Sequence, residues 1–179
     1  MSHDESPARD QSPPRDRANA MPQGGAALYT PAERARRDAS AWTIVQGVLA
    51  PLQFAIFLLS LVLVLRTLLT GQGALAADLS IIAKTFALYA IMVTGSIWEK
   101  EVFGKWLFAR PFFWEDVFSM VVIALHTAYL AMLLGGIGSV EARLLVALAG
   151  YAAYVVNAGQ FLLKLRAARL ADSVQAVPA

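Results

Sequence analysis

Apolar residues of this chain are gathered into four stretches of about 20 residues, the length that an α-helix needs to cross a bilayer core of roughly 30 Å. A soluble helix bundle would carry a polar stripe on each helix, whereas these stretches are apolar all round. We therefore expect an all-α integral membrane protein with a four-helix bundle. Its spans are predicted at about 42–65, 79–98, 117–137 and 144–163.

Composition supports this class of protein. The chain is 58% hydrophobic and 16% charged, and its mean hydropathy is +0.54. Of the four spans, only the second contains a charged residue, Lys84. Because Lys84 lies toward one end of its span, we expect its side chain to snorkel to the membrane surface.

Basic residues near the span ends predict the topology. Two, Arg66 and Arg143, flank one side of the membrane. Nine flank the other side: Arg34, Arg36, Arg37, Lys100, Lys105, Arg110, Lys164, Arg166 and Arg169. The positive-inside rule places both termini and the loop between the second and third spans in the cytoplasm. These residues form no single patch, so the net charge of +2 predicts no nucleic-acid partner.

Some segments outside the spans are expected to be disordered and others to form a helix. Residues 1–28 are polar and rich in proline, which favours a disordered tail and predicts no cleavable signal peptide. Thr30, Pro31 and Glu33 have the spacing of a capping box, with proline at the first helical position. They should begin a short basic helix at the membrane surface. Residues 29–170 form the expected membrane domain, followed by a tail at 171–179.

The loop between the second and third spans reads WEKEVFGKWLFARPFFWED over residues 98–116. Its tryptophans are typical of an aromatic belt at the lipid headgroups. Such a belt does not require the four interleaved carboxylates, Glu99, Glu101, Glu115 and Asp116. A solvated charge cluster explains Glu101, but Glu115 begins a polar helix face that enters the membrane.

That face carries Glu115, Ser119, Val122, His126 and Tyr129, spaced by four and three residues. His126 lies about 15 Å from Glu115 along the helix axis, near the middle of the membrane. An ionisable residue there indicates either a functional site or a hydrogen bond between helices. The same two alternatives apply to Gln46 and Gln53 of the first span and to a face of the fourth span with Tyr154, Asn157, Phe161 and Lys164.

Missing motifs narrow the chemistry. The chain has no cysteine, which excludes disulfides, thiolate metal sites and cysteine nucleophiles. No phosphate-binding loop, nucleophile elbow or histidine metal motif is present. Carboxylates, one histidine within the membrane and many aromatic residues remain, and they favour acid and base chemistry on a flat, hydrophobic substrate.

Three segments carry a family resemblance: IWEKEVFGKWLF, FFWEDVFS and NAGQFLLKLR. Together with the chain around them, from Tyr29 to Leu170, they resemble the vinyl bacteriochlorophyllide hydratase family of bacteriochlorophyll biosynthesis. The resemblance implies hydration of the ring-A vinyl group of chlorophyllide a, or of the related bacteriochlorophyllide, to a 1-hydroxyethyl group. The family implies a bacterial inner membrane, cytoplasmic or intracytoplasmic, and the inferred reaction requires no dissociable cofactor. The resemblance leaves open association with other enzymes of the pathway or with a second copy of the chain.

Candidate roles follow from that chemistry. Protonation of an alkene needs an acid, and attack by water needs a base, so Glu115, Asp116 and Glu99 are the candidate catalytic residues. His126 could bind the substrate's central magnesium or a peripheral carbonyl. The other candidate substrate contacts are Tyr154, Asn157, Trp114, Lys105 and Arg110, the last two for the propionate.

Two other functions fit the same residues. A non-catalytic pigment-binding or photosystem assembly protein would use the same pocket without changing the pigment. A small transporter is disfavoured, because no paired broken helices or internal repeats are evident.

Overall fold

The computed structural model describes residues 28–175, with side chains described as far as Leu170. The expected disordered tail lies, apart from Leu28, outside the described residues. The described elements are α1 (Pro31–Ala39), α2 (Ala41–Thr70), α3 (Ala74–Phe103), the short 3-10 helix η1 (Arg110–Phe112), α4 (Phe113–Leu134) and α5 (Val140–Gln175).

Four of these helices, α2 to α5, are long and apolar enough to cross a membrane. The expectation of an all-α membrane bundle is therefore confirmed for the described part of the chain. The third span ends earlier than predicted, at Leu134 instead of residue 137. Gly135 and Gly136 end this helix, and Gly136 adopts a φ of 63°, which favours glycine. Helix α5 continues to Gln175, into the segment expected to be a tail.

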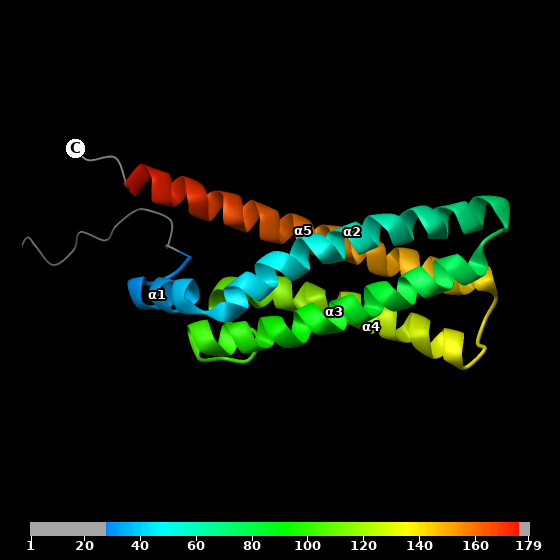
Figure 1. The fold of residues 1–179 in the computed structure, drawn as a ribbon, viewed down its shortest axis with the longest axis horizontal. Helices are drawn as coiled ribbons and strands as arrows, with labels where there is room; N and C mark the ends of the chain where they lie inside the picture. The colour runs from blue at the N-terminus through cyan, green and yellow to red at the C-terminus, as the bar shows by residue number, and fades with distance from the viewer. Residues whose placement is uncertain (1–27, 176–179) are drawn as a thin grey trace, which may run out of the picture.

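The four long helices run side by side along the long axis of the molecule (Figure 1). Helix α1, the loop between α3 and α4, and the C-terminal part of α5 lie at one end, which we call the α1 end. The α2–α3 and α4–α5 turns lie at the opposite end. Helix α2 packs mainly on α3, and α4 mainly on α5. The bundle thus consists of two helical hairpins with a less extensive interface between them.

Local sequence explains how α1 begins and where it is anchored. Thr30 and Glu33 form the predicted capping box in both directions. Arg36 donates from Nε to the Val102 carbonyl at 2.8 Å, and the Ser40 hydroxyl bonds the Glu101 carboxylate at 2.7 Å. Helix α1 is therefore held against the last turns of α3, at the α1 end of the bundle.

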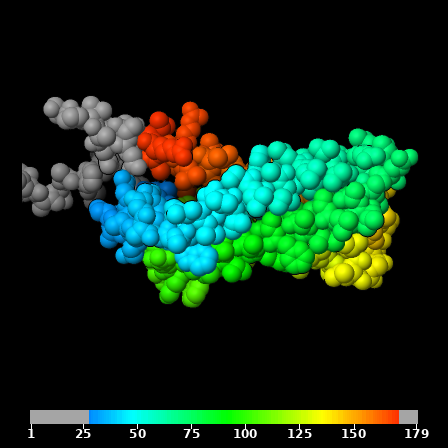
Figure 2. All heavy atoms as spheres, in the orientation of Figure 1, coloured from blue at the N-terminus to red at the C-terminus, as the bar shows by residue number. Residues whose placement is uncertain are grey.

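Apolar side chains occupy both the interior and the outer surface. Phe57, Ile81, Val122 and Leu144 are buried in the main core. Many large apolar side chains of the long helices, such as Leu69 on α2, are exposed, and Figure 2 shows the continuous outer surface that α2 and α3 form on one side. Exposure of these apolar side chains to water would be unfavourable, whereas the lipid tails of a bilayer would solvate them. The chain is accordingly a multi-pass membrane protein.

Candidate functional site

The polar face predicted for the third span points into the bundle. Glu115, Val122, His126 and Tyr129 of α4 are all buried. Helix α5 supplies the facing residues in antiparallel order: Lys164 pairs with Glu115, Asn157 bonds Ser119, and Tyr151 lies beside His126. Of the predicted face of α5, Asn157 and Lys164 contact α4, whereas Tyr154 lies against Phe57 of α2 and Lys84 of α3, and Phe161 against Phe112. The two polar faces meet along the α4–α5 interface.

Three carboxylates gather at the α1 end of this interface, although they come from two helices. Glu99 of α3 and Glu115 and Asp116 of α4 are each at most 5% exposed. The Glu99 and Asp116 carboxyl groups interact with each other. Because two ionised carboxylates repel each other in a buried site, a proton on one member of the pair is favoured. We call Glu99, Glu115 and Asp116 the carboxyl cluster.

The same pair of acids also orders the loop between α3 and α4. The backbone N–H of Phe108 donates to Asp116 Oδ2 at 2.7 Å, and that of Ala109 donates to Glu99 Oε2 at 3.1 Å. Phe108 has a φ of 59°, the only positive value at a non-glycine position in the described chain. Such a conformation is costly for a bulky residue and persists only where its surroundings hold it. Asp116 and Glu99 provide that support, so their structural role is established alongside any chemical one.

Glu115 has a different partner. Its Oε1 forms an ion pair with Lys164 Nζ at 2.5 Å, and the Glu115 side chain is 5% exposed against 26% for Lys164. Lys164 also donates to the carbonyl of Pro111. The second carboxylate oxygen of Glu115, Oε2, is buried without a protein partner among the described residues. This end of the α4–α5 interface therefore has an ionised carboxylate with one free acceptor, close to the molecular surface.

Aromatic side chains pack beside the carboxyl cluster. Phe112 contacts Trp98, Phe103 and Phe161, with ring centroids 5.6 to 5.8 Å apart. Tyr29 stacks on Phe103 at 5.7 Å. Burial raises the pKa of the Tyr29 hydroxyl, which stays neutral at physiological pH. These aromatic side chains close the α1 end of the bundle next to the carboxyl cluster.

Two of the loop tryptophans face outward instead. Trp106 is 59% exposed and Trp114 is 64% exposed, positions that suit an aromatic belt. The structure therefore does not bring Trp114 together with the carboxyl cluster. Lys105 and Arg110 are also exposed, and both line a pocket of about 160 Å³ next to Phe103 and Pro111. They remain at the rim of the α1 end.

His126 lies deeper in the bundle, where its surroundings fix the state of its ring. Its Nδ1 lies 2.8 Å from the Val122 carbonyl. Since a carbonyl only accepts, Nδ1 must donate, and in the neutral ring Nε2 then carries the lone pair. This Nε2 is buried and has no protein partner within the described chain. It is available to a metal centre or to a hydrogen-bond donor.

Lys84 does not snorkel, and that prediction was wrong. The residue is fully buried, and its Nζ lies 3.6 Å from the centroid of the Tyr154 ring. His126 lies beside Tyr151, one turn from Tyr154 on α5, so Lys84 and His126 lie in the same region of the bundle. Lys84 Nζ has no hydrogen-bond partner among the described residues. An ionisable group in a membrane span is a candidate functional residue by default, and this signal was present in the sequence.

A chain of hydroxyl groups adjoins His126 on the α2–α3 side. The Tyr151 hydroxyl bonds Ser60 at 2.5 Å, and Ser60 bonds Ser80 at 2.6 Å. Gly150 permits the close packing of α5 on His126, because a Cβ at this position would lie 2.8 Å from His126 Cε1. Neither feature was evident from the sequence, since each depends on which helices are neighbours.

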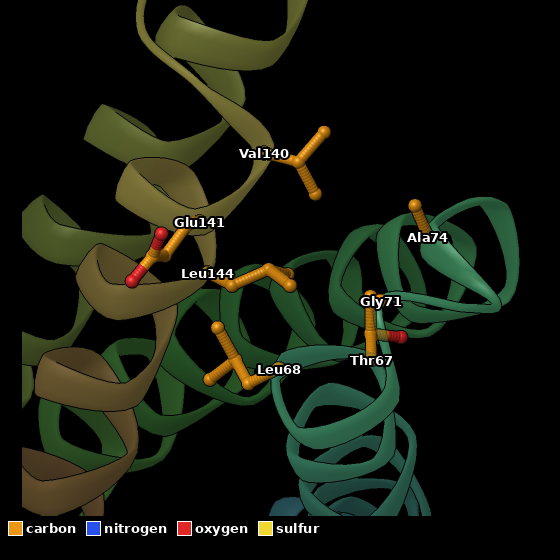
Figure 3. A pocket seen from close by; sticks show the side chains of 7 residues that line it. All are labelled: Thr67, Leu68, Gly71, Ala74, Val140, Glu141 and Leu144. Carbon is orange, nitrogen blue, oxygen red and sulfur yellow. The ribbon is translucent and has the colours of Figure 1, made fainter.

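Two pockets lie at opposite ends of the described bundle. A pocket of about 260 Å³ lies at the opposite end of the bundle, bounded by α2, α3 and α5 and including Thr67, Glu141 and Leu144 (Figure 3). Pockets for drug-sized ligands usually measure about 300–1,000 Å³, so neither this pocket nor the one at Lys105 would enclose a large planar ligand. Within the described chain, no three His, Asp or Glu side chains are grouped as metal ligands.

Comparison with known proteins connects these features to a family. Residues 29–167 match the sequence profile of the family described as 2-vinyl bacteriochlorophyllide hydratase. A 2-vinyl bacteriochlorophyllide hydratase from Rhodobacter capsulatus is 65% identical over 144 residues, 80% of this chain and 84% of that protein. One from Cereibacter sphaeroides is 64% identical over 143 residues, 80% of this chain and 89% of that protein. No solved structure matches the chain.

Proposed function

This chain belongs to the 2-vinyl bacteriochlorophyllide hydratase family, and on that premise we propose that it adds water to the ring-A vinyl group of chlorophyllide a or of the related bacteriochlorophyllide. The product carries a 1-hydroxyethyl group, which makes the protein a hydro-lyase of bacteriochlorophyll biosynthesis. The family resemblance expected from the sequence is confirmed, and with it the hydratase activity expected for the chain.

The observation that carries the residue assignment is the carboxyl cluster, in which two buried acids adjoin a carboxylate paired with Lys164. We infer that the Glu99–Asp116 pair holds one proton, because two buried ionised carboxylates would repel each other. The ion pair with Lys164 is made by an ionised Glu115. Hydration of an alkene needs an acid and a base, and the cluster offers both within one buried site.

In the proposed reaction, the Glu99–Asp116 pair gives its proton to the terminal carbon of the vinyl group. The two electrons of the double bond form the new C–H bond, and positive charge develops on the carbon attached to the macrocycle, which delocalises it. The oxygen of a water molecule then bonds to that carbon. Glu115 accepts the proton released by the water, and this proton returns to the Glu99–Asp116 pair. The net change is the addition of one water molecule.

Substrate binding is assigned to His126, Tyr154, Lys105 and Arg110, and not to Asn157, whose amide already donates to Ser119. We place the central magnesium of the macrocycle near His126, whose Nε2 carries the free lone pair. Tyr154 and Asn157, both buried on α5, lie between His126 and the carboxyl cluster. Lys105 and Arg110 could bind the propionate at the surface. Trp114 could contact only a part of the substrate that lies outside the bundle.

Neither of the two pockets described above would enclose a planar substrate, so the packing of the helices indicates how such a substrate would enter. The interface between the α2–α3 hairpin and the α4–α5 hairpin is less extensive than the contacts within each hairpin. Lys84 and His126 come from different hairpins and both lie at this interface. We propose that the substrate enters from the lipid by separating the hairpins there. The basic residues near the span ends favour a cytoplasmic location for both termini and for the carboxyl cluster.

A direct test uses the purified full-length protein in detergent micelles. Incubation with chlorophyllide a should yield a product heavier by one water molecule, identified by mass spectrometry. The Glu99→Gln variant is the matched control, because its amide oxygen can still accept the N–H of Ala109 but the group no longer donates an acidic proton. Binding of pigment by the wild-type protein with no product would instead support the non-catalytic pigment-binding alternative.

A further inference from the structure

Helices α4 and α5 carry a row of hydrogen-bond acceptors whose atoms are buried and that no donor among the described residues reaches. Glu115 Oε2, Gln160 Oε1, Asn157 Oδ1 and His126 Nε2 all belong to this row. The nearby Lys84 Nζ is a buried donor without a hydrogen-bond partner in the described part of the chain. Buried polar atoms are rarely left unpaired, because they lose their hydrogen bonds to water on folding and need a replacement partner.

These atoms follow one another along the interface. Lys164 faces Glu115, Asn157 faces Ser119, and Tyr151 faces His126. Gln160 lies one turn from both Lys164 and Asn157 on α5. From Glu115 to His126 the row spans about 15 Å of helix. It begins where Lys164 is partly exposed and ends in the middle of the bundle.

The chemistry of the row selects its ligand. Acceptors cannot satisfy one another, so a small molecule with two donors is needed between them, and water is such a molecule. Bound waters in protein interiors typically make two to four hydrogen bonds to groups of this kind. Lys84 lies at the inner end of the row, where its Nζ can donate a hydrogen bond to the last water.

We propose that the α4–α5 interface binds a row of water molecules from Glu115 past Gln160 and Asn157 to Lys84 and His126. The row supplies the water that the reaction consumes and returns the proton to the carboxyl cluster. The role of the row in supplying water rests on the proposed hydratase function. The presence of the row does not. When pigment binds at His126, its magnesium displaces the innermost water.

The row itself can be tested on the wild-type protein without substrate. Hydroxyl radicals generated by a short X-ray pulse form from water, so they modify side chains beside bound water. Tyr154 should be modified faster than Tyr129, a buried tyrosine whose hydroxyl bonds Asp78. Equal and slow modification of Tyr154 and Tyr129 would overturn the proposal.

A variant tests the function of the row. Asn157→Leu should slow the modification of Tyr154 and lower kcat by about tenfold or more, while the KM for chlorophyllide a changes little. Gln46→Leu is the matched control, because it removes a comparable bond between helices, from Gln46 to Thr94 at 2.7 Å, outside the row. It should retain wild-type kcat.

The outcomes separate this proposal from the proposed function. Wild-type kcat in Asn157→Leu would overturn the row as a water supply, as would an increase in KM alone, since that would make Asn157 a pigment contact. If the wild-type protein forms no hydrated product, the proposed function fails, yet the modification of Tyr154 still decides whether the row exists.

Discussion

The ring of His126 and the backbone of Gly150 are in such close contact that no side chain fits between them. A Cβ at residue 150 would lie 2.8 Å from His126 Cε1 and 2.9 Å from its Nδ1. Real Cβ atoms are essentially never this close to another heavy atom. This contact sets the separation of α4 and α5 at the depth where Lys84 is also buried.

Substitution of Gly150 by alanine should therefore destabilise the protein, although alanine usually favours a helix by about 1 kcal/mol. We expect a loss of about 1–3 kcal/mol, typical of overpacking, measured by thermal unfolding in detergent with circular dichroism. Gly159→Ala is the control on the same helix, since a Cβ there meets nothing within 4 Å, and it should be neutral or stabilising. Equal stability of the two variants would show that His126 can move aside.

The acids that bond the α3–α4 loop should be separable into structural and chemical roles. Asp116→Asn and Glu99→Gln keep an oxygen that can accept the N–H groups of Phe108 and Ala109. We expect both variants to fold and bind pigment while turnover falls by on the order of a hundredfold or more. Glu101→Gln is the control, because Glu101 bonds Ser40 outside the cluster. Near wild-type turnover in both variants would exclude the pair as the acid.

Glu115 and Lys164 should respond differently to neutral substitution. Glu115→Gln removes the proposed base and should lower turnover by about a hundredfold while pigment binding is retained. Lys164→Met leaves a buried carboxylate without its cation, so we expect a loss of about 2 kcal/mol or more in the free energy of unfolding. The double variant should regain much of that stability. If Glu115→Gln changes only the stability of the protein, the role of Glu115 is a favourable interaction with the helix dipole at the start of α4, and it takes no part in catalysis.

Replacement of His126 by phenylalanine tests the assignment of the pigment-binding nitrogen. The phenyl ring restores most of the packing beside Tyr151 but removes the lone pair of Nε2. Weaker binding of chlorophyllide a, measured by absorbance titration of the folded variant, is the expected result. Unchanged affinity would assign His126 to packing, and loss of the protein from the membrane would assign its main role to stabilising the bundle.

Topology can be checked independently of chemistry. The count of nine basic residues against two predicts that a reporter enzyme active only in the periplasm, fused after residue 171, stays inactive. The same reporter inserted at Gln72, in the turn between α2 and α3, should be active. The reverse pattern would place the carboxyl cluster on the periplasmic side.

The sequence by itself determined the features that depend on neighbouring residues. Apolar stretches of membrane-spanning length predicted α2 to α5, and the spacing of Thr30 and Glu33 predicted the start of α1. Helical periodicity grouped Glu115 with His126 on one face of α4. These predictions succeeded because helix length, capping and periodicity are set within a few turns of one helix.

Only the tertiary structure decided which helices meet and which apolar faces turn to the lipid. Lipid tails are as apolar as leucine, so hydropathy cannot tell a buried face from a lipid-facing one. For that reason the sequence placed Lys84 at the membrane surface, although its side chain is buried in the bundle. The interaction between Glu99 and Asp116, the Glu115–Lys164 ion pair and the contact between His126 and Gly150 all join different helices. Their distances follow from how α3, α4 and α5 pack, which no single helix specifies.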